Sequence, residues 1–297
     1  MPKGVPKSGF RKTKNYLSKK NGQVFSAKNA DVRPQMAISK ETDAQIRAKL
    51  IERFGALEDM GRATLSGRNR SMIVSGPAGV GKTFPMMRLA ETLEKNGKKV
   101  SYVRGFVRPT GLYKTFYENR HKGCPVIFDD SDSVFLDEQC LGLLKTACDM
   151  TKSRQLSWLA ETNMVDDSEE RLPRNFEFEG SVIFITNYDF DYLINKGNKL
   201  SPHLQAMMSR SLYLDMGIKN RRDFLIRIQM AVEEGMLDDS GLNKDQMNFI
   251  VKYIEKNADR LRELSLRMVI KLAQLHLIDP VKFESNAKLT CCVSETK

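Results

Sequence analysis

The chain has 297 residues, of which 41% are hydrophobic, and a formal net charge of +11. This length accommodates one large domain or two small ones, and the composition is ordinary for a globular protein. No apolar run reaches the roughly 18 residues that a membrane-spanning helix needs, and the basic N-terminus lacks the apolar segment of a secretory signal. We therefore expect a cytoplasmic protein with no membrane partner. The five cysteines form no C-x-x-C pair, so we expect reduced thiols and no zinc site.

The positive charge is concentrated in residues 1–38. Nine lysines and arginines stand against one aspartate before residue 36. Apolar residues are too sparse there to offset the entropy that is lost on ordering, which predicts a disordered tail. Such an arm can bind nucleic acid through phosphate contacts, or it can simply keep the protein in solution, and both interpretations fit the composition.

From residue 39 the pattern predicts helices alternating with strands. Apolar residues at three- and four-residue intervals predict a helix over residues 39–65, which leads into an apolar strand at 72–75. The elements expected next, in chain order, are a helix at 83–96, a strand at 100–103, a helix at 111–121, a strand at 125–130 and a helix at 137–150.

Residues 152–180 are expected to form a β-hairpin with a long acidic tip, because apolar residues alternate on both sides of that tip. An apolar strand at 181–187, a short helix at 201–209 and a strand at 212–214 complete the pattern. Apolar strands that alternate with helices predict an α/β fold, in which a mainly parallel sheet is covered by helices on both faces.

From residue 218 the strand pattern stops, and helices are expected at 220–234, 244–256 and 261–277. We therefore expect a small all-α domain at the C-terminus. The predicted division of the chain is a basic disordered tail at 1–38, an α/β core at 39–217, the helical domain at 218–285 and a flexible C-terminus at 286–297.

The most specific motif lies between the strand at 72–75 and the helix at 83–96. It has the spacing G-x-x-x-x-G-K-[ST] of a phosphate-binding loop, and its residues are Gly76, Pro77, Ala78, Gly79, Val80, Gly81, Lys82 and Thr83. The glycines let successive N–H groups point at phosphate oxygens, and the helix that follows presents its positive N-terminal end to the same anion. Lys82 adds a charge on the outer phosphates, and the Thr83 hydroxyl is placed to bind magnesium. The motif predicts binding of ATP with Mg²⁺.

Two aspartates end the expected strand at 125–130. A carboxylate at the end of a neighbouring strand can reach the magnesium shell, so we assign Asp129 to Mg²⁺. Asp130 is the candidate to polarise the attacking water in ATP hydrolysis, with Asp132 as the next candidate. Adjacent aspartates alone would more often cap a helix or solvate a loop, and it is the P-loop that favours the catalytic interpretation.

These features together resemble the AAA+ ATPase module over about residues 40–280. The resemblance is carried by the P-loop, the carboxylate pair, an apolar strand that ends in Asn187, an arginine at position 210 and the helical C-terminal domain. It implies that Asn187 is the first sensor, which orients water or contacts the γ-phosphate. It implies that Arg210 is the arginine finger of a neighbouring subunit's site, although an arginine after a helix can also be a surface residue. Arg267 resembles the second sensor on the lid helix, and the expected assembly is a homo-oligomeric ring, a hexamer.

The carboxylate pair departs from most AAA+ members, which have Asp-Glu where this chain has Asp-Asp. Superfamily-three viral DNA helicases commonly have Asp-Asp, and they insert a hairpin similar to the one expected here into the central channel. The shorter side chain would position the water differently, which weakens the case for Asp130 as the base. The segments around residues 172–187 and 264–268 resemble poorly characterised AAA+ proteins of tailed bacteriophages, which implies a phage protein in the host cytoplasm.

The segment after the expected strand at 100–103 corresponds to the aromatic channel loop of AAA+ rings. Phe106 and Val107 are the candidates to grip a polymer, and packing beneath the next helix is the alternative. Basic residues nearby alternate with Tyr113, Phe116 and Tyr117, a pattern that resembles a surface for tracking single strands.

The expected function is therefore that of an ATP-hydrolysing motor that acts on DNA by unwinding, translocation or loading. A protein-remodelling ATPase that acts on a protein partner, and a nucleotide-dependent scaffold with little turnover, are the alternatives. Stimulation of hydrolysis by DNA, stimulation by a protein, or nucleotide binding without turnover would distinguish the three.

Overall fold

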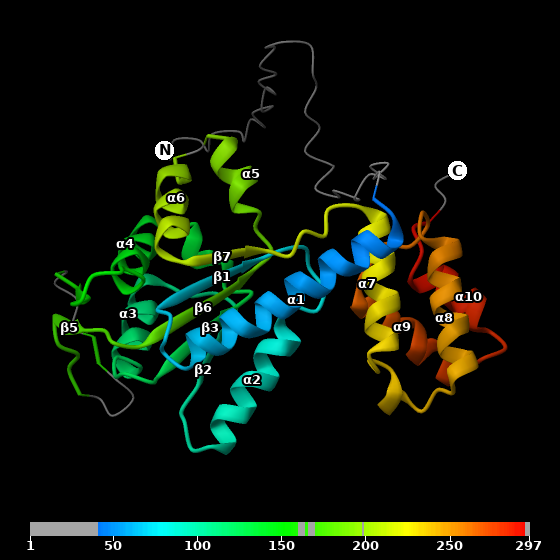
Figure 1. Ribbon diagram of the computed structural model, residues 1–297, viewed down its shortest axis with the longest axis horizontal. Coiled ribbons are helices and arrows are strands. Elements are labelled where there is room, and N and C mark those ends of the chain that lie inside the picture. The colour runs from blue at the N-terminus through cyan, green and yellow to red at the C-terminus, as the bar shows by residue number, and fades with distance from the viewer. Residues whose placement is uncertain (1–40, 160–163, 166–169, 198, 295–297) are drawn as a thin grey trace, which may run out of the picture. The chain divides into compact units, whose positions relative to one another are not determined.

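The computed structural model describes residues 41–159, 164–165, 170–197 and 199–294 (Figure 1). The basic tail predicted at 1–38 lies outside these residues, as does most of the acidic tip of the predicted hairpin. All the described residues belong to one compact unit.

Five strands form one parallel sheet in the order β2-β3-β6-β1-β7. Their bounds are β1 Ser71–Ser75, β2 Ser101–Arg104, β3 Pro125–Asp129, β6 Ser181–Thr186 and β7 Leu212–Asp215. The three central strands are buried along their whole length, which is why they are continuous apolar runs in the sequence. The predicted α/β fold with a parallel sheet is confirmed.

Helices cover both faces of this sheet (Figure 1). The helices on one face are α1 Asp43–Leu65 and α2 Thr83–Lys95, and those on the other are α3 Pro109–Glu118, α4 Glu138–Ala147 and α6 Ser201–Arg210. Because side chains alternate along a strand, Met72 and Val74 pack with the first group while Ile73 packs with the second. The sheet therefore forms the middle of three layers.

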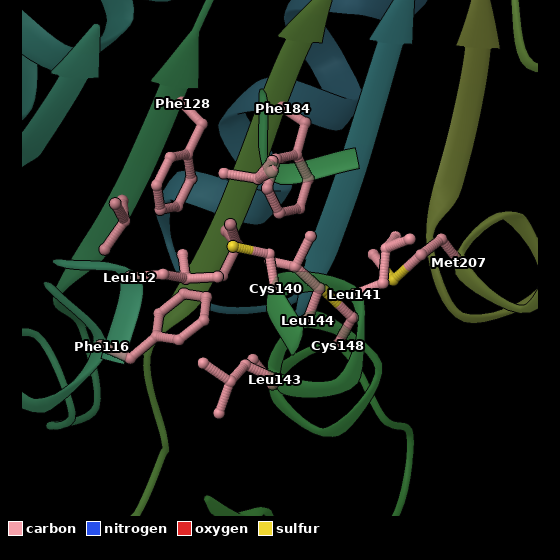
Figure 2. Packing of buried hydrophobic residues seen from close by; sticks show 14 of the residues in the cluster. Leu112, Phe116, Phe128, Cys140, Leu141, Leu143, Leu144, Cys148, Phe184 and Met207 are labelled. Atoms are coloured by element: carbon pink, nitrogen blue, oxygen red, sulfur yellow. The ribbon is translucent and has the colours of Figure 1, made fainter. Parts of the chain in front are cut away.

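The core between the sheet and α3 and α4 is rich in aromatic rings. Figure 2 shows Phe128 of β3 beside Phe184 of β6, and their ring centroids lie 5.3 Å apart in a stacked arrangement. Phe116 of α3 meets the Phe128 ring edge-on at 6.0 Å. These contacts fix β3 and β6 relative to each other.

The predicted hairpin is present as β4 (Gln155–Ser157) paired antiparallel with β5 (Asn175–Glu177), between α4 and β6 in the chain. It packs on α3, where Tyr113 donates a hydrogen bond from Oη to the carbonyl of Pro173 at 2.9 Å. Tyr113 and Phe116 are fully buried, so the predicted strand-tracking surface of stacking rings does not exist on this helix. Their three- and four-residue spacing is the spacing of a core-facing helix side.

Four helices follow the sheet: α7 Arg221–Glu233, α8 Lys244–Asn257, α9 Leu266–Ile278 and α10 Phe283–Thr290. Their apolar side chains share one core with Ile46 and Leu50 of α1. The third helix begins at Leu266 rather than at residue 261, because Ser265 caps it and accepts a hydrogen bond from the Met268 N–H at 3.1 Å.

The C-terminal segment differs from the flexible terminus expected from residue 286. The helix α10 continues to Thr290, and Ala287, Cys291 and Cys292 are buried. Cys292 also forms an antiparallel bridge with Leu261, which holds the segment against the helical core. The cysteine pair thus acts as small apolar side chains, and all five cysteines are free thiols. Within the described ranges, no helix is long and apolar enough to cross a membrane.

Candidate active site

Polar groups from three neighbouring strands meet at the carboxyl edge of the sheet. The register aligns Ser75 of β1 with Thr186 of β6, and Asp129 of β3 with Ile185 of β6. The P-loop follows β1, Asp129 ends β3 and Asn187 follows β6. Because the strands are parallel and adjacent, the residues that end them lie together, where ligands bind in open α/β sheets.

The P-loop backbone depends on glycine at two positions. Gly79 and Gly81 have φ angles of 72° and 96°, in the left-handed region that side-chain-bearing residues avoid. A Cβ atom on Gly79 would also approach the Cβ of Ser265 to 2.6 Å. The helix α2 begins directly after the loop at Thr83, and no side chain caps it. Its first N–H groups are therefore available to an anion.

Lys82 is buried and hydrogen-bonded inside this loop. Its ammonium group donates to the carbonyls of Gly76 at 2.6 Å and Pro77 at 2.8 Å, and to Oδ1 of Asn187 at 2.9 Å. Burial lowers the pKa of Lys82 to about 8, against the opposing effect of three nearby aspartates. A bound phosphate would favour the charged form of the Lys82 side chain, so the site would bind an anion favourably.

The oxygen atoms near Thr83 fit a magnesium ion. The Thr83 hydroxyl donates to Oδ1 of Asp129 at 3.0 Å, and Asp129 is buried. A hydroxyl and a carboxylate are the hard oxygen ligands that Mg²⁺ prefers, together with phosphate oxygens. The second oxygen of Asp129 accepts a hydrogen bond from Arg104 Nε at 3.2 Å. Sequence reasoning missed Arg104, which is placed there by its register opposite Asp129.

Asn187 links the lysine to the second aspartate. Its Oδ1 accepts from Lys82, and its Nδ2 donates to Oδ1 of Asp130 at 2.9 Å. Asp130 is exposed and has a φ angle of 52°, the one positive value among the described non-glycine residues. Such a conformation costs free energy and is held by its surroundings, which is common at functional sites. The three predicted residues therefore form one hydrogen-bonded chain.

A third carboxylate, Asp132, lies behind this chain. The Thr186 hydroxyl and the Asn187 backbone N–H both donate to it. Burial is the largest cause of a raised pKa for Asp132, and these hydrogen bonds and the charge of Lys82 oppose that rise. Asp132 holds the end of β6, and so it sets the position of the Asn187 side chain.

The helix α9 approaches the P-loop from the other side. The Leu266 N–H donates to the carbonyl of Gly79 at 2.7 Å. The next residue, Arg267, has an exposed side chain whose charge contributes to lowering the pKa of Lys82, so it faces the same site. Arg227 of α7 donates to the carbonyl of Val80 at 3.3 Å. The local sequence does not indicate that Arg227 belongs to the site, because its contact with Val80 joins residues 147 positions apart in the chain.

Arg210 lies at the opposite edge of the sheet. Its carbonyl accepts a hydrogen bond at 3.0 Å from the hydroxyl of Ser71, the first residue of β1, whereas the P-loop follows the last residue of that strand. A five-residue strand is about 16 Å long, so Arg210 does not reach the P-loop of its own chain. Its Nη1 donates to the Ala206 carbonyl at 2.9 Å, and its Nε lies 3.8 Å from Asp149 Oδ2.

The two candidate channel-loop residues differ in exposure. Phe106 is 78% exposed, whereas Val107 is buried and its N–H donates to the Ser133 hydroxyl at 3.0 Å. Gly105 precedes them with a φ angle of 88° and turns the chain away from β2. A contact with a polymer is therefore open to Phe106, and Val107 instead anchors the loop.

Comparison with known proteins gives one sequence relative. The chain is 32% identical over 250 residues to an uncharacterised 36.7 kDa protein from the nrdC–mobD intergenic region of Enterobacteria phage T4, and the match covers 84% of this chain and 76% of the relative. No family model matches the chain.

Two solved structures align weakly with the chain. The Holliday junction branch migration motor RuvB of Thermotoga maritima aligns with a TM-score of 0.44 and 13% identity, over 86% of this chain and 72% of RuvB. Domain III of the replication initiation protein DnaA of Thermotoga maritima aligns with a TM-score of 0.44 and 13% identity, over 78% of this chain and 84% of that domain. At this identity the likeness concerns the fold alone.

Proposed function

The chain belongs to the same family as the uncharacterised phage T4 protein and has the AAA+ P-loop fold, and from this premise we propose that it is a Mg²⁺-dependent ATPase. We propose further that it works as an oligomeric ring on DNA in the cytoplasm of a phage-infected host. The observation that carries the enzymatic part is the hydrogen-bonded chain from Lys82 through Asn187 to Asp130.

The P-loop and α2 hold the triphosphate of ATP. Lys82 exchanges its two loop carbonyl acceptors for phosphate oxygens, and the free N–H groups of the first turn of α2 bind the same anion. Thr83 and Asp129 would hold Mg²⁺, which would neutralise charge on the phosphates when bound. Arg104 balances part of the charge of Asp129.

Asp130 and Asn187 serve the hydrolytic step. Asn187 lies between Lys82 and Asp130, so its amide is placed to sense the outer phosphate and to orient a water molecule. Asp130 is exposed to solvent and accepts the proton of that water. Asp132 holds Asn187 in place through the end of β6.

The site is completed in trans by Arg210. The guanidinium group lies at the amino edge of the sheet, too far from its own P-loop to act there. A neighbouring subunit that presents its P-loop to this edge would receive the charge that phosphoryl transfer needs. This requirement is what supports an oligomer.

DNA is the favoured polymer because of the exposed aromatic side chain next to basic residues. Phe106 can stack on a base, and the exposed Arg108 lies two residues further along the chain. The basic residues of the tail would add phosphate contacts.

The test is the ATPase rate of the purified full-length chain with Mg²⁺, measured with and without single- and double-stranded DNA. We expect Mg²⁺-dependent hydrolysis that DNA stimulates, and loss of that stimulation in Phe106→Ala. Tyr192→Ala is the matched control, because Tyr192 is also an exposed aromatic residue but lies on α5 (Phe190–Asn195).

Three outcomes would overturn parts of the proposal. Nucleotide binding without turnover would make the protein a scaffold. Hydrolysis that DNA leaves unchanged but a protein partner stimulates would make it a protein remodeller. A protein that stays monomeric with ATP and Mg²⁺ would remove the ring.

A further inference from the structure

A basic pocket of about 520 Å³ opens beside Arg210 at the amino edge of the sheet. Six of the residues that line it are Lys145, Thr146, Asp149, Ser153, Arg154 and Arg210. They come from α4, from the segment that follows it and from the end of α6. Arg70 lies against the same segment and donates to the carbonyls of Asp149 and Thr151.

The charges of this basic pocket do not balance. Lys145, Arg154 and Arg210 line it against a single carboxylate, Asp149, and Arg70 adds a further cation at its wall. Burial and the charge of Arg70 both lower the pKa of Arg154, which is the direction expected for a crowded group of cations. Such a pocket attracts an anion that carries several negative charges.

Two of the four cations are committed to the fold. Arg154 is buried and donates to the carbonyls of Ala147 at 2.6 Å and Gly180 at 2.9 Å. Arg70 is held by carbonyls in the same way. These two arginines supply positive potential, and backbone carbonyls hold both of them in place.

The other two cations keep donors for a ligand. Arg210 is half-buried, and its guanidinium forms one hydrogen bond to the described residues, from Nη1 to the Ala206 carbonyl, while the nearest Asp149 oxygen is 3.8 Å from its Nε. The contact recorded for Lys145 Nζ is a long one, 3.4 Å to Nδ1 of His203. Both cations are partly exposed at the pocket surface.

We propose that Lys145 acts with Arg210 in trans, so that both side chains stabilise the charge that develops during hydrolysis on the phosphates of a nucleotide held by the P-loop of a second copy of this chain. The proposal rests on the function proposed above for Arg210. Its own P-loop lies at the other edge of the sheet, so the anion in this pocket comes from another molecule. A triphosphate carries enough negative charge to match the unbalanced cations, and a lysine supplies a point charge where the arginine supplies a planar fork.

The first experiment measures turnover of Lys145→Ala and Lys145→Gln at saturating ATP and Mg²⁺. We expect a loss of about ten- to a hundredfold, the size of one charge-assisted hydrogen bond, while binding of a fluorescent ATP analogue is retained. Lys152→Ala is the matched control, because Lys152 is exposed beside the pocket and does not line it. Lys145→Gln keeps the side-chain length, so it tests the charge even if the alanine variant folds poorly.

The second experiment mixes variants under conditions of proven subunit exchange. Lys82→Ala has no working P-loop but an intact basic pocket, so mixing it with Arg210→Ala or with Lys145→Ala should restore part of the activity in both cases. A mixture of Arg210→Ala with Lys145→Ala should show no more activity than the two variants measured separately, because every interface then lacks one of the two cations.

The outcomes separate this proposal from the one on which it rests. Recovery in the mixture of Arg210→Ala with Lys145→Ala would mean that Lys145 serves its own chain's site, which overturns the inference. Full activity of Lys145→Gln alone would also overturn it. Failure of Lys82→Ala to rescue Arg210→Ala would instead overturn the trans action of Arg210 itself.

Discussion

The carboxyl and amino edges of the parallel sheet both carry charged groups, but they satisfy them differently. At the carboxyl edge, Lys82 has three hydrogen-bond acceptors, and Asp129 has two donors. At the amino edge, Arg210 has a buried Nε with no hydrogen-bond partner among the described residues, and one carboxylate faces several cations. Buried polar groups in native proteins are normally hydrogen-bonded.

This difference indicates which half of the site is complete within one chain. The carboxyl edge is preorganised, so a nucleotide replaces contacts that already exist. The amino edge has more cations than carboxylates, so we infer that the anion that balances them comes from outside the chain. The following predictions test this contrast, beginning with the variant that should remove the most activity.

Lys82→Ala should abolish turnover and weaken binding of ATP by about ten- to a hundredfold, because it removes the buried charge at the carboxyl edge. Binding is measured by titration with a fluorescent ATP analogue. Lys95→Ala is the control, since Lys95 lies exposed at the end of the same helix. Unchanged affinity in Lys82→Ala would remove the nucleotide site from the P-loop.

Arg210→Ala should reduce turnover by about 10³-fold or more while leaving ATP affinity nearly unchanged, as expected for a finger that acts only in the transition state. Arg210→Lys should recover little, because an ammonium group lacks the planar fork. Single-turnover rates measure this effect. A parallel loss of ATP affinity would instead assign Arg210 to binding of the ground-state nucleotide and would contradict a role confined to the transition state.

Asp130→Asn should reduce turnover by about a hundredfold at unchanged ATP affinity, because the amide keeps the shape but does not accept a proton. Asparagine tolerates the left-handed backbone that Asp130 adopts, so this variant is expected to fold. Wild-type turnover would exclude Asp130 as the base. Asp132→Asn is then the variant to measure, since Asp132 is the next carboxylate in the same segment.

Arg104→Gln should have the smallest effect. The affinity for Mg²⁺ should rise by a few-fold, because a cation leaves the neighbourhood of Asp129. The Mg²⁺ concentration for half-maximal nucleotide binding measures this change. Arg108→Gln is the control on the same loop. A lower affinity for Mg²⁺ in this variant would instead assign Arg104 to holding Asp129 in its binding orientation.

Sequence reasoning located the carboxyl edge well because each strand carries its own local signal. An apolar run followed by the P-loop glycines, by the aspartate pair or by Asn187 is visible within a few residues, and parallel pairing then brings the ends together. The fold class was predictable for the same reason. The roles of these residues in catalysis stay predictions.

The amino edge and the supporting contacts were not visible in the sequence. Arg104 meets Asp129 through strand register, and Arg154 reaches Gly180 across the sheet edge, so both depend on tertiary structure. Tyr113 and Phe116 were misinterpreted because a basic, aromatic segment has the same composition on a surface and on a core-facing helix. The cysteines near the end of the chain looked like a flexible terminus because the contacts that hold them, a bridge to Leu261 and packing in the helical core, come from residues distant in the sequence.

The hydrogen bond from the Leu266 N–H to the Gly79 carbonyl links the phosphate loop to α9, so hydrogen exchange at Leu266 reports motion of α9 relative to the loop. If α9 swings away when nucleotide leaves, that amide loses its acceptor and its hydrogen exchanges with solvent. Exchange at Leu266 should then be fast in the nucleotide-free chain and slow in the loaded one. The Met268 N–H is bonded to Ser265 at the start of the same helix, so its exchange rate should change much less and serves as an internal reference.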